Sequence, residues 1–220
     1  MAISAAVGRS DFRVFKATGD ITATLAEFRT VLGDPINVAR REIKWDGAPA
    51  EMPGDFFNTT VKAGAIFTTD GIGFRNSDSD FGEINPAYAD EFNAFSVFKT
   101  FMPIGSAELT VDFRVPGFDI PAATRGFGIV FSDVERQGAA SIKLFDAEGR
   151  SLGQYHAPVR SDSAGFSFVG VVFESPIVAQ VRITSGQRAL GAGVQDLSDG
   201  GNLDLAVMDD YLYAEPQAIP

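Results

Sequence analysis

The sequence predicts an all-β protein, a single antiparallel β-sandwich with one short helix near its N-terminus. Three observations favour this fold class. From about residue 40 onward, apolar and polar residues alternate along short segments, which is the period of a half-buried strand. Only one segment, close to the N-terminus, has a helical period. Phenylalanine occurs 20 times and is spread over nearly every expected strand, as expected for rings that fill the space between two sheets.

The helix is expected over about residues 20–33. Four apolar residues recur there at spacings of four, three and four and so share one face: Ile21, Leu25, Phe28 and Leu32. Gly33 and the following Asp-Pro end the segment. We therefore divide the chain into an N-terminal strap, residues 1–39, and a β-sandwich, residues 40–220, which together form one structural domain.

The strands differ in how completely they are expected to be buried. ELTVDFRVP (108–116) and AQVRIT (179–184) alternate strictly, which predicts one buried and one wet face. GFGIVFSDV (126–134) and FSFVGVVFESP (166–176) are almost continuously apolar, which predicts central strands covered on both faces, with glycines where aromatic rings need space. LDLAVMDDYLYAEP (203–216) predicts a long final strand.

Charge and composition exclude several functional classes. With 18 Lys and Arg against 29 Asp and Glu, the formal net charge is −11, which disfavours binding to nucleic acid or anionic lipid and favours hard cations. The absence of cysteine excludes disulfides and thiolate chemistry. No apolar run approaches the roughly 18 residues that span a bilayer, so no transmembrane segment is expected.

Catalytic patterns are weak. Residues 149–153 match G-x-S-x-G, but the turn joins two expected strands, whereas a nucleophile elbow needs a strand followed by a helix. His156 is the only histidine, so a histidine-based triad has no alternative base. Paired carboxylates remain a catalytic route, and a carbohydrate-active hydrolase or lyase is therefore kept as an alternative function.

Calcium is the more plausible chemistry, because it takes six to eight oxygen ligands and acids are plentiful. Three acidic clusters compete: Asn76, Asp78 and Asp80; the Gly-rich run from Asp196 to Asp204; and Asp209-Asp210. Adjacent acids in a strand point to opposite faces, so either Asp209 or Asp210 should face the interior and need compensation. The compensating group could be a cation, backbone donors or an arginine: Arg40, Arg41 or Arg125.

Two further features bear on ligand binding. Residues 75–107 are turn-rich and weakly periodic, and this loop with Tyr88 is the candidate ligand-binding rim. Trp45, the only tryptophan, shares its strand face with Ile43, which favours a core anchor over a sugar-stacking platform.

Seven segments together resemble a known group of proteins. They resemble a family of uncharacterised, commonly exported bacterial proteins, similar to sorting-signal exoproteins that end in a motif like MDDF-x-Y-x-EP. The resemblance covers nearly the whole chain and is carried, in order, by RREIKWDG (40–47), AIFTTDGIGF (65–74), RGFGIVFSDV (125–134), FDAEG (145–149), FSFVGVVF (166–173), VRITSG (181–186) and VMDDYLYAEP (207–216).

This resemblance implies a jelly-roll or lectin-like sandwich, an extracytoplasmic location and a structural calcium ion near the last strand. By analogy with calcium-bearing jelly rolls, the metal ligands would be Asp46, Asp133, Asp209 and Asp210. It implies no catalytic residue. We therefore expect an exported, non-enzymatic module that binds a glycan or surface polymer, with the hydrolase and a matrix or adhesion protein as alternatives.

Overall fold

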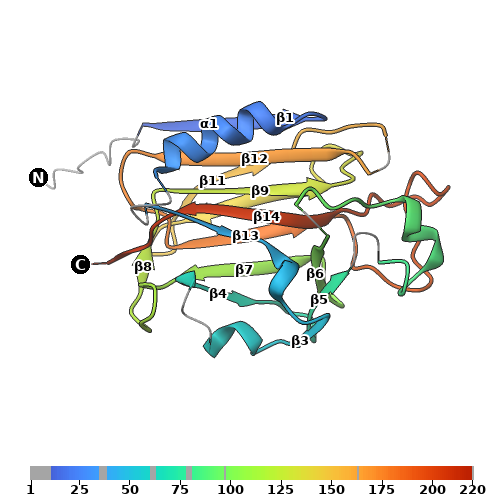
Figure 1. The fold of residues 1–220 in the computed structure, drawn as a ribbon, viewed down its shortest axis with the longest axis horizontal. Helices are drawn as coiled ribbons and strands as arrows, with labels where there is room; N and C mark the ends of the chain where they lie inside the picture. Colours follow the sequence, from blue (N-terminus) through green and yellow to red (C-terminus); the bar gives the residue numbers. More distant parts are fainter. Residues whose placement is uncertain are drawn as a thin grey trace, which may run out of the picture.

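The structure is a computed structural model that describes residues 11–34, 39–59, 63–77, 81–96, 98–162 and 164–219. Its strands form two main antiparallel sheets and one two-stranded ribbon (Figure 1). The larger sheet has the order β1 (Phe12–Thr18), β12 (Phe166–Phe173), β9 (Gly126–Ser132), β14 (Val207–Ala214), β6 (Thr100–Ile104), β5 (Gly73–Ser77) and β3 (Glu51–Pro53), and β2 (Arg40–Ile43) also pairs with β14. The smaller sheet has the order β11 (Ser151–His156), β10 (Ala140–Phe145), β13 (Gln180–Ser185), β7 (Glu108–Phe113) and β4 (Ala65–Thr68). The ribbon pairs β15 (Gln217–Ala218) with β8 (Ala122–Ala123).

The predicted all-β fold class is confirmed. The described residues contain one α-helix, α1 (Thr22–Leu32), which lies inside the predicted range, and short 3-10 helices that include η1 (Trp45–Gly47), η2 (Phe56–Thr59) and η4 (Pro86–Asp90). No helix in the described part of the chain is long and apolar enough to cross a membrane.

Aromatic rings fill the space between the two sheets, as the phenylalanine content predicts. Trp45 is 1% exposed and stacks on Phe101 at 3.7 Å between ring centroids. Its indole N–H donates to the backbone oxygen of Asp209 at 2.8 Å, which satisfies the only polar atom of the side chain. Trp45 is thus a core anchor, and it ties η1 to the central strand β14.

A second apolar layer lies between α1 and the outer face of the larger sheet. The four residues of the predicted helical face are all buried there. Phe28 fits because Gly128 of β9 and Gly170 of β12 are direct cross-strand partners, and a Cβ on either would lie 2.6 Å from its ring. β9 and β12 are therefore covered on both faces, as their continuous apolar sequences predict.

The N-terminal segment is more than a strap. β1 pairs with β12 along its whole length, from Phe12 opposite Phe173 to Thr18 opposite Ser167, so it forms the edge of the larger sheet. Two arginines then fix the helix that follows: Arg40 donates to the carbonyls of Arg29 and Gly33, and Arg125 donates to those of Val31 and Leu32. These cations sit at the C-terminal end of α1, where the helix dipole favours them.

Candidate metal centre and binding groove

Three segments that are distant in sequence meet at one end of the sandwich. β9 ends at Ser132, and Asp133 follows with a φ of 64°, a left-handed conformation that aspartate tolerates better than most residues. η4 and the loop after β13 lie at the same end (Figure 1). Tyr88 in η4 joins them, because its hydroxyl lies 2.8 Å from the carbonyl oxygen of Val194 and 3.1 Å from that of Gly191.

Five carboxylates gather where these segments meet, and we call them the acid cluster: Glu91, Asp133, Glu135, Asp196 and Asp204. They form two triads that share Asp196. Within each triad, every residue can place one carboxylate oxygen within 4.8 Å of the oxygens of the other two. Four of the five are at most 3% exposed, and only Glu135 is partly exposed.

Protein donors orient part of the acid cluster. Asp196 accepts from the backbone N–H of Leu205 at 2.6 Å on one oxygen and from that of Ser198 at 2.8 Å on the other. Asp204 uses only Oδ2, which accepts from the backbone N–H groups of Glu135 and Arg136. The hydroxyl of Ser198 donates to Glu91. Hydrogen bonds thus orient Asp196, Asp204 and Glu91, and they leave other carboxylate oxygens of the acid cluster without a hydrogen-bond donor.

Four other oxygens of the acid cluster are buried without a hydrogen bond. They are both oxygens of Asp133, Oδ1 of Asp204 and Oε2 of Glu135. Among the described residues, no lysine or arginine forms an ion pair with any of the five acids. Buried charge without a partner is costly, so this arrangement calls for positive charge or bound protons.

The pKa values reflect this cost. Burial, and then the adjoining carboxyl and charge of Glu91, raise the pKa of Asp133 to about 10. Burial and the neighbouring Asp196 raise the pKa of Glu135 to about 7, and burial raises that of Asp204 to about 6 against the opposing backbone N–H groups. Burial also raises the pKa of Glu91. A bound cation would replace these protons, so the described structure contains buried acidic groups that could hold a metal ion.

Sequence reasoning found part of the acid cluster. Asp133 was an expected ligand, and Asp196 to Asp204 was one of the three competing runs. Glu91 and Glu135 were missed. Glu135 follows Asp133 by two residues at the end of a buried strand, and this pair of acids in the sequence could have indicated that both residues belong to one site. Glu91 lies in the turn-rich segment, and no pattern in its neighbouring sequence distinguishes it from other acids.

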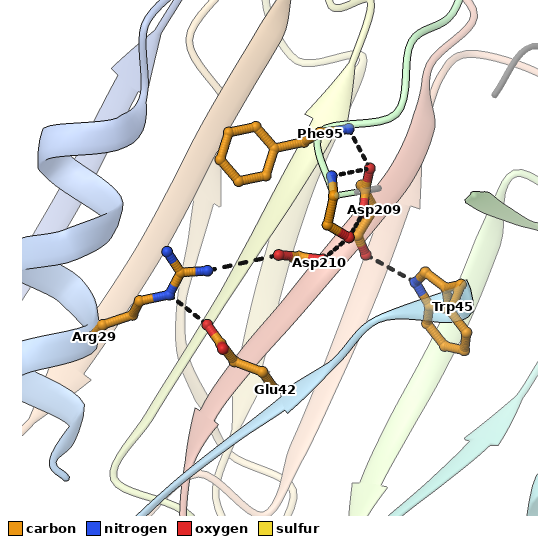
Figure 2. Close-up of polar contacts among 7 residues, drawn as sticks. Arg29, Glu42, Trp45, Phe95, Asp209 and Asp210 are labelled. Atoms are coloured by element: carbon orange, nitrogen blue, oxygen red, sulfur yellow. Dashed lines mark hydrogen bonds and ion pairs between the residues drawn. The ribbon is translucent and has the colours of Figure 1, made fainter. Parts of the chain in front are cut away.

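The structure places Asp209 and Asp210 elsewhere, in a network of their own (Figure 2). Asp209 accepts from the backbone N–H of Phe95 at 2.5 Å and from the hydroxyl of Ser96 at 3.1 Å, and the same hydroxyl lies 2.6 Å from Asp210. The two side chains do not diverge as adjacent strand residues would, because the pairing register of β14 shifts between Met208 and Tyr211.

The compensation for this pair agrees in part with the expected one. Backbone donors, one of the expected groups, serve Asp209, but the arginine near Asp210 is Arg29 on α1, whose Nη2 lies 3.7 Å from Oδ2 of Asp210. The expected arginines are used otherwise, since Arg40 and Arg125 donate to the end of α1 and Arg41 pairs with Glu215. Burial, and then the charge of Asp210, raise the pKa of Asp209 to about 8.

The other predicted site residues are also separate from the acid cluster. Asp46 is exposed, and its carboxylate accepts from the backbone N–H of Phe98 at 3.2 Å. Neither triad contains Asp46, Asp209 or Asp210, so of the four expected ligands only Asp133 lies in the acid cluster. Asp78 and Asp80 lie outside the described residues.

Tyr88 is not on a rim. Its side chain is fully buried, and its hydroxyl holds the loop at residues 191–194, so it presents no surface on which a ligand could stack. The turn-rich sequence around Tyr88 predicts a loop, but it does not distinguish an exposed ring from one that anchors the loop.

A large groove lies at the other end of the sandwich, between the sheet edges formed by β1 and β11. Its volume is about 920 Å³, and its lining includes Phe12, Asp146, Arg150, Gln154 and Tyr155. Phe12 is 43% exposed, and its ring centroid lies 6.0 Å from that of Tyr155. β9 starts near the groove and ends at the acid cluster, and its seven residues separate the two by roughly 20 Å.

The G-x-S-x-G match belongs to this groove but is not a nucleophile elbow. Residues 149–153 lead from the turn after β10 into β11, and the next element of the described chain is the strand β12 rather than a helix. Ser151 is exposed, and its hydroxyl accepts from the backbone N–H of Gly153 at 3.3 Å. The expected strand–turn–strand context is therefore confirmed.

Comparisons with known proteins add little beyond this geometry. No family model and no curated protein matches the sequence. Among solved structures, TmCBM61 in complex with β-1,4-galactotriose is 9% identical with a TM-score of 0.35, over 80% of this chain and 99% of that chain. The enzymatically active domain of tailspike protein 4 of bacteriophage CBA120 is 14% identical with a TM-score of 0.27, over 74% of this chain and 20% of that chain. Likenesses this distant carry no functional argument, and the functional reading depends on the acid cluster and the groove.

Proposed function

We propose that the protein is an exported, non-enzymatic β-sandwich module that binds a glycan or another surface polymer and holds calcium as a structural ion. The groove is the observation that supports the ligand, and the acid cluster supports the ion. The exported setting and the kinship with sorting-signal exoproteins are part of the proposal and follow from the sequence resemblance.

The groove offers the two kinds of contact that a sugar chain needs. The partly exposed ring of Phe12, packed on Tyr155, provides an apolar surface for the C–H face of a sugar ring. The amide of Gln154, the guanidinium of Arg150 and the carboxylate of Asp146 provide donors and acceptors for hydroxyl groups. Mixed apolar and polar lining of this kind favours an uncharged, hydroxyl-rich ligand.

The acids of the groove are poorly suited to catalysis. A glycosidase needs one carboxyl group that is still protonated at the working pH. Arg150 lies 2.7 Å from Asp146 and 2.7 Å from Glu148. Burial alone would raise the pKa of Asp146, but the hydrogen bonds and charge of Arg150 outweigh it and lower the pKa. The acids with strongly raised pKa values lie in the acid cluster, where burial keeps Asp133 and Asp204 from a polymer.

Calcium fits the donor set of the acid cluster. The potential ligands are carboxylate oxygens, which hard cations prefer, and calcium tolerates irregular geometry at about 2.3–2.6 Å. Extracellular modules bind calcium with dissociation constants of about 10⁻⁴–10⁻³ M, and we expect an affinity in this range for an exported protein. The ion would join η4, the end of β9 and the loop at residues 196–204.

Glycan binding is tested with a glycan array followed by affinity electrophoresis in gels that contain the polysaccharides bound on the array. Phe12→Ala should weaken binding at least tenfold, whereas Phe98→Ala removes a ring that is 67% exposed outside the groove and should leave binding unchanged. An array without hits would overturn the proposed ligand. Turnover of a bound polysaccharide would favour the hydrolase.

A further inference from the structure

We propose that the acid cluster binds two calcium ions side by side, with Asp196 bridging them. This inference rests on the calcium proposed above and adds its stoichiometry and ligand sets. The first ion would be held by Glu91, Asp133 and Asp196, and the second by Glu135, Asp196 and Asp204.

The spacing of the oxygens supports two positions. Two oxygens on one calcium ion can be at most about 5 Å apart, which is twice the calcium–oxygen distance. Each triad meets this limit, because its oxygens lie within 4.8 Å of one another. The five acids do not form one group under the same limit, so a single ion would leave some of the carboxylates without a cation.

Each position has its own unpartnered buried oxygen. In the first triad, Asp133 is fully buried, and neither of its oxygens has a hydrogen bond. In the second, Asp204 is fully buried; its Oδ2 accepts from two backbone N–H groups, and its Oδ1 has no partner. One ion could satisfy only one of these residues unless the loops moved.

Asp196 has the geometry of a bridging ligand. It is fully buried, belongs to both triads, and its orientation is fixed by N–H donors on both oxygens. Each carboxylate oxygen has two lone pairs, so an oxygen that accepts one hydrogen bond can still bind a cation. Five ionised carboxylates carry five negative charges, of which two calcium ions would neutralise four.

The loop that carries Asp196 is closed by a backbone hydrogen bond that fixes the position of Asp196 between the two triads. The backbone N–H of Gly201 donates to the carbonyl oxygen of Asp196 at 2.7 Å, which closes the loop. A Cβ at Gly201 would lie 2.4 Å from that same oxygen, so only glycine allows the closure. This geometry brings Asp204 back beside Asp196.

The test is the calcium stoichiometry of the whole chain, measured by isothermal titration calorimetry and by elemental analysis after gel filtration in a buffer whose calcium concentration exceeds the expected dissociation constant of about 10⁻⁴–10⁻³ M, with the free calcium of the buffer subtracted. We expect two equivalents for the wild type, one for Asp133→Asn, one for Asp204→Asn and none for the double variant. Asp199→Asn removes an exposed charge from the same loop and should keep both equivalents. Melting in EDTA verifies that each variant is folded, and Glu135→Gln replaces Asp204→Asn if the latter does not fold.

The outcomes separate this inference from the proposed function. One equivalent in the wild type, lost in Asp133→Asn and kept in Asp204→Asn and Glu135→Gln, would overturn the second ion and leave a structural calcium. Two equivalents that persist in Asp133→Asn and Asp204→Asn would place both ions elsewhere and overturn the inference. No bound calcium in the wild type would overturn the inference and the proposed structural ion together, while the glycan result stands on its own test.

Discussion

Replacing Asp133 by asparagine separates the charge of a proposed ligand from its shape. The two side chains have nearly the same size, and neither oxygen of Asp133 has a hydrogen bond that the substitution could break. Without calcium, the folded protein must hold a proton on the buried carboxyl of Asp133, which asparagine does not need, so Asp133→Asn should stabilise the protein. With calcium, the same substitution should remove one ion and its stabilisation.

The size of both effects follows from the structure. At pH 7 the folded protein without calcium keeps Asp133 protonated, because its pKa is about 10, whereas the unfolded chain ionises near 3.8. The difference between pH 7 and the unfolded pKa is about three units, and each unit corresponds to about 1.36 kcal/mol. Keeping the proton on Asp133 therefore lowers the free energy of unfolding by about 4 kcal/mol, and this is the largest stabilisation that Asp133→Asn could give. At a calcium concentration of 100 times the dissociation constant, each bound ion contributes about 2.7 kcal/mol.

The assay is thermal melting at pH 7 in EDTA and in calcium, for the wild type, Asp133→Asn and the control Asp199→Asn. A chain of this size shifts its Tm by about 2–4 °C per kcal/mol, so both effects are measurable. We expect Asp133→Asn to melt above the wild type in EDTA and to gain less from calcium. A lower Tm in EDTA would refute the reasoning, because Asp133 would then stabilise the fold without an ion.

Three further predictions follow from other parts of the structure. Gly128→Ala should cost about 1–3 kcal/mol of unfolding free energy in urea, because the new Cβ meets Phe28, whereas Gly47→Ala, which has open space around it, should be neutral. In calcium-saturated protein, the raised pKa of Asp209 contributes to the free energy of unfolding, and this contribution is complete below pH 4 and is lost as the pH rises to about 8. The Tm of the wild type should therefore fall between about pH 4 and pH 8, and that of Asp209→Asn should fall less. Glycan affinity should be unchanged in EDTA below the melting transition, because the groove and the acid cluster lie at opposite ends of β9; a loss of binding by the folded protein would put the cation in the binding site.

Local patterns were sufficient to predict the architecture. The helical face of α1 and the alternation of β7 are each decided by neighbours within one segment. The continuous apolar runs of β9 and β12 predicted cover on both faces, and the glycines at 128 and 170 are explained by one ring, Phe28. These features depend on the periods of strands and helices, which a sequence displays directly.

The acid cluster could be predicted only in part, because its acids come from three segments. Asp196 and Asp204 share a loop with a visible Gly-rich pattern, but Glu91 is more than 100 residues away and is brought near by tertiary contacts, such as those of Tyr88 with Val194 and of Ser198 with Glu91. Asp209 and Asp210 were favoured because adjacent acids in an apolar strand need compensation. The two carboxylates are indeed compensated, but by Ser96 and Arg29, after a register shift in β14 that brings both side chains near Ser96. No pattern in the sequence around residues 209–210 indicates these features.

The most direct test of the central claim is a crystal structure grown in calcium, with an anomalous difference map that locates the ions. The account predicts two peaks that flank Asp196, each within about 2.3–2.6 Å of carboxylate oxygens of its triad. A map with no peak at the acid cluster, or with its calcium beside Asp46, Asp209 or Asp210 instead, would contradict the account.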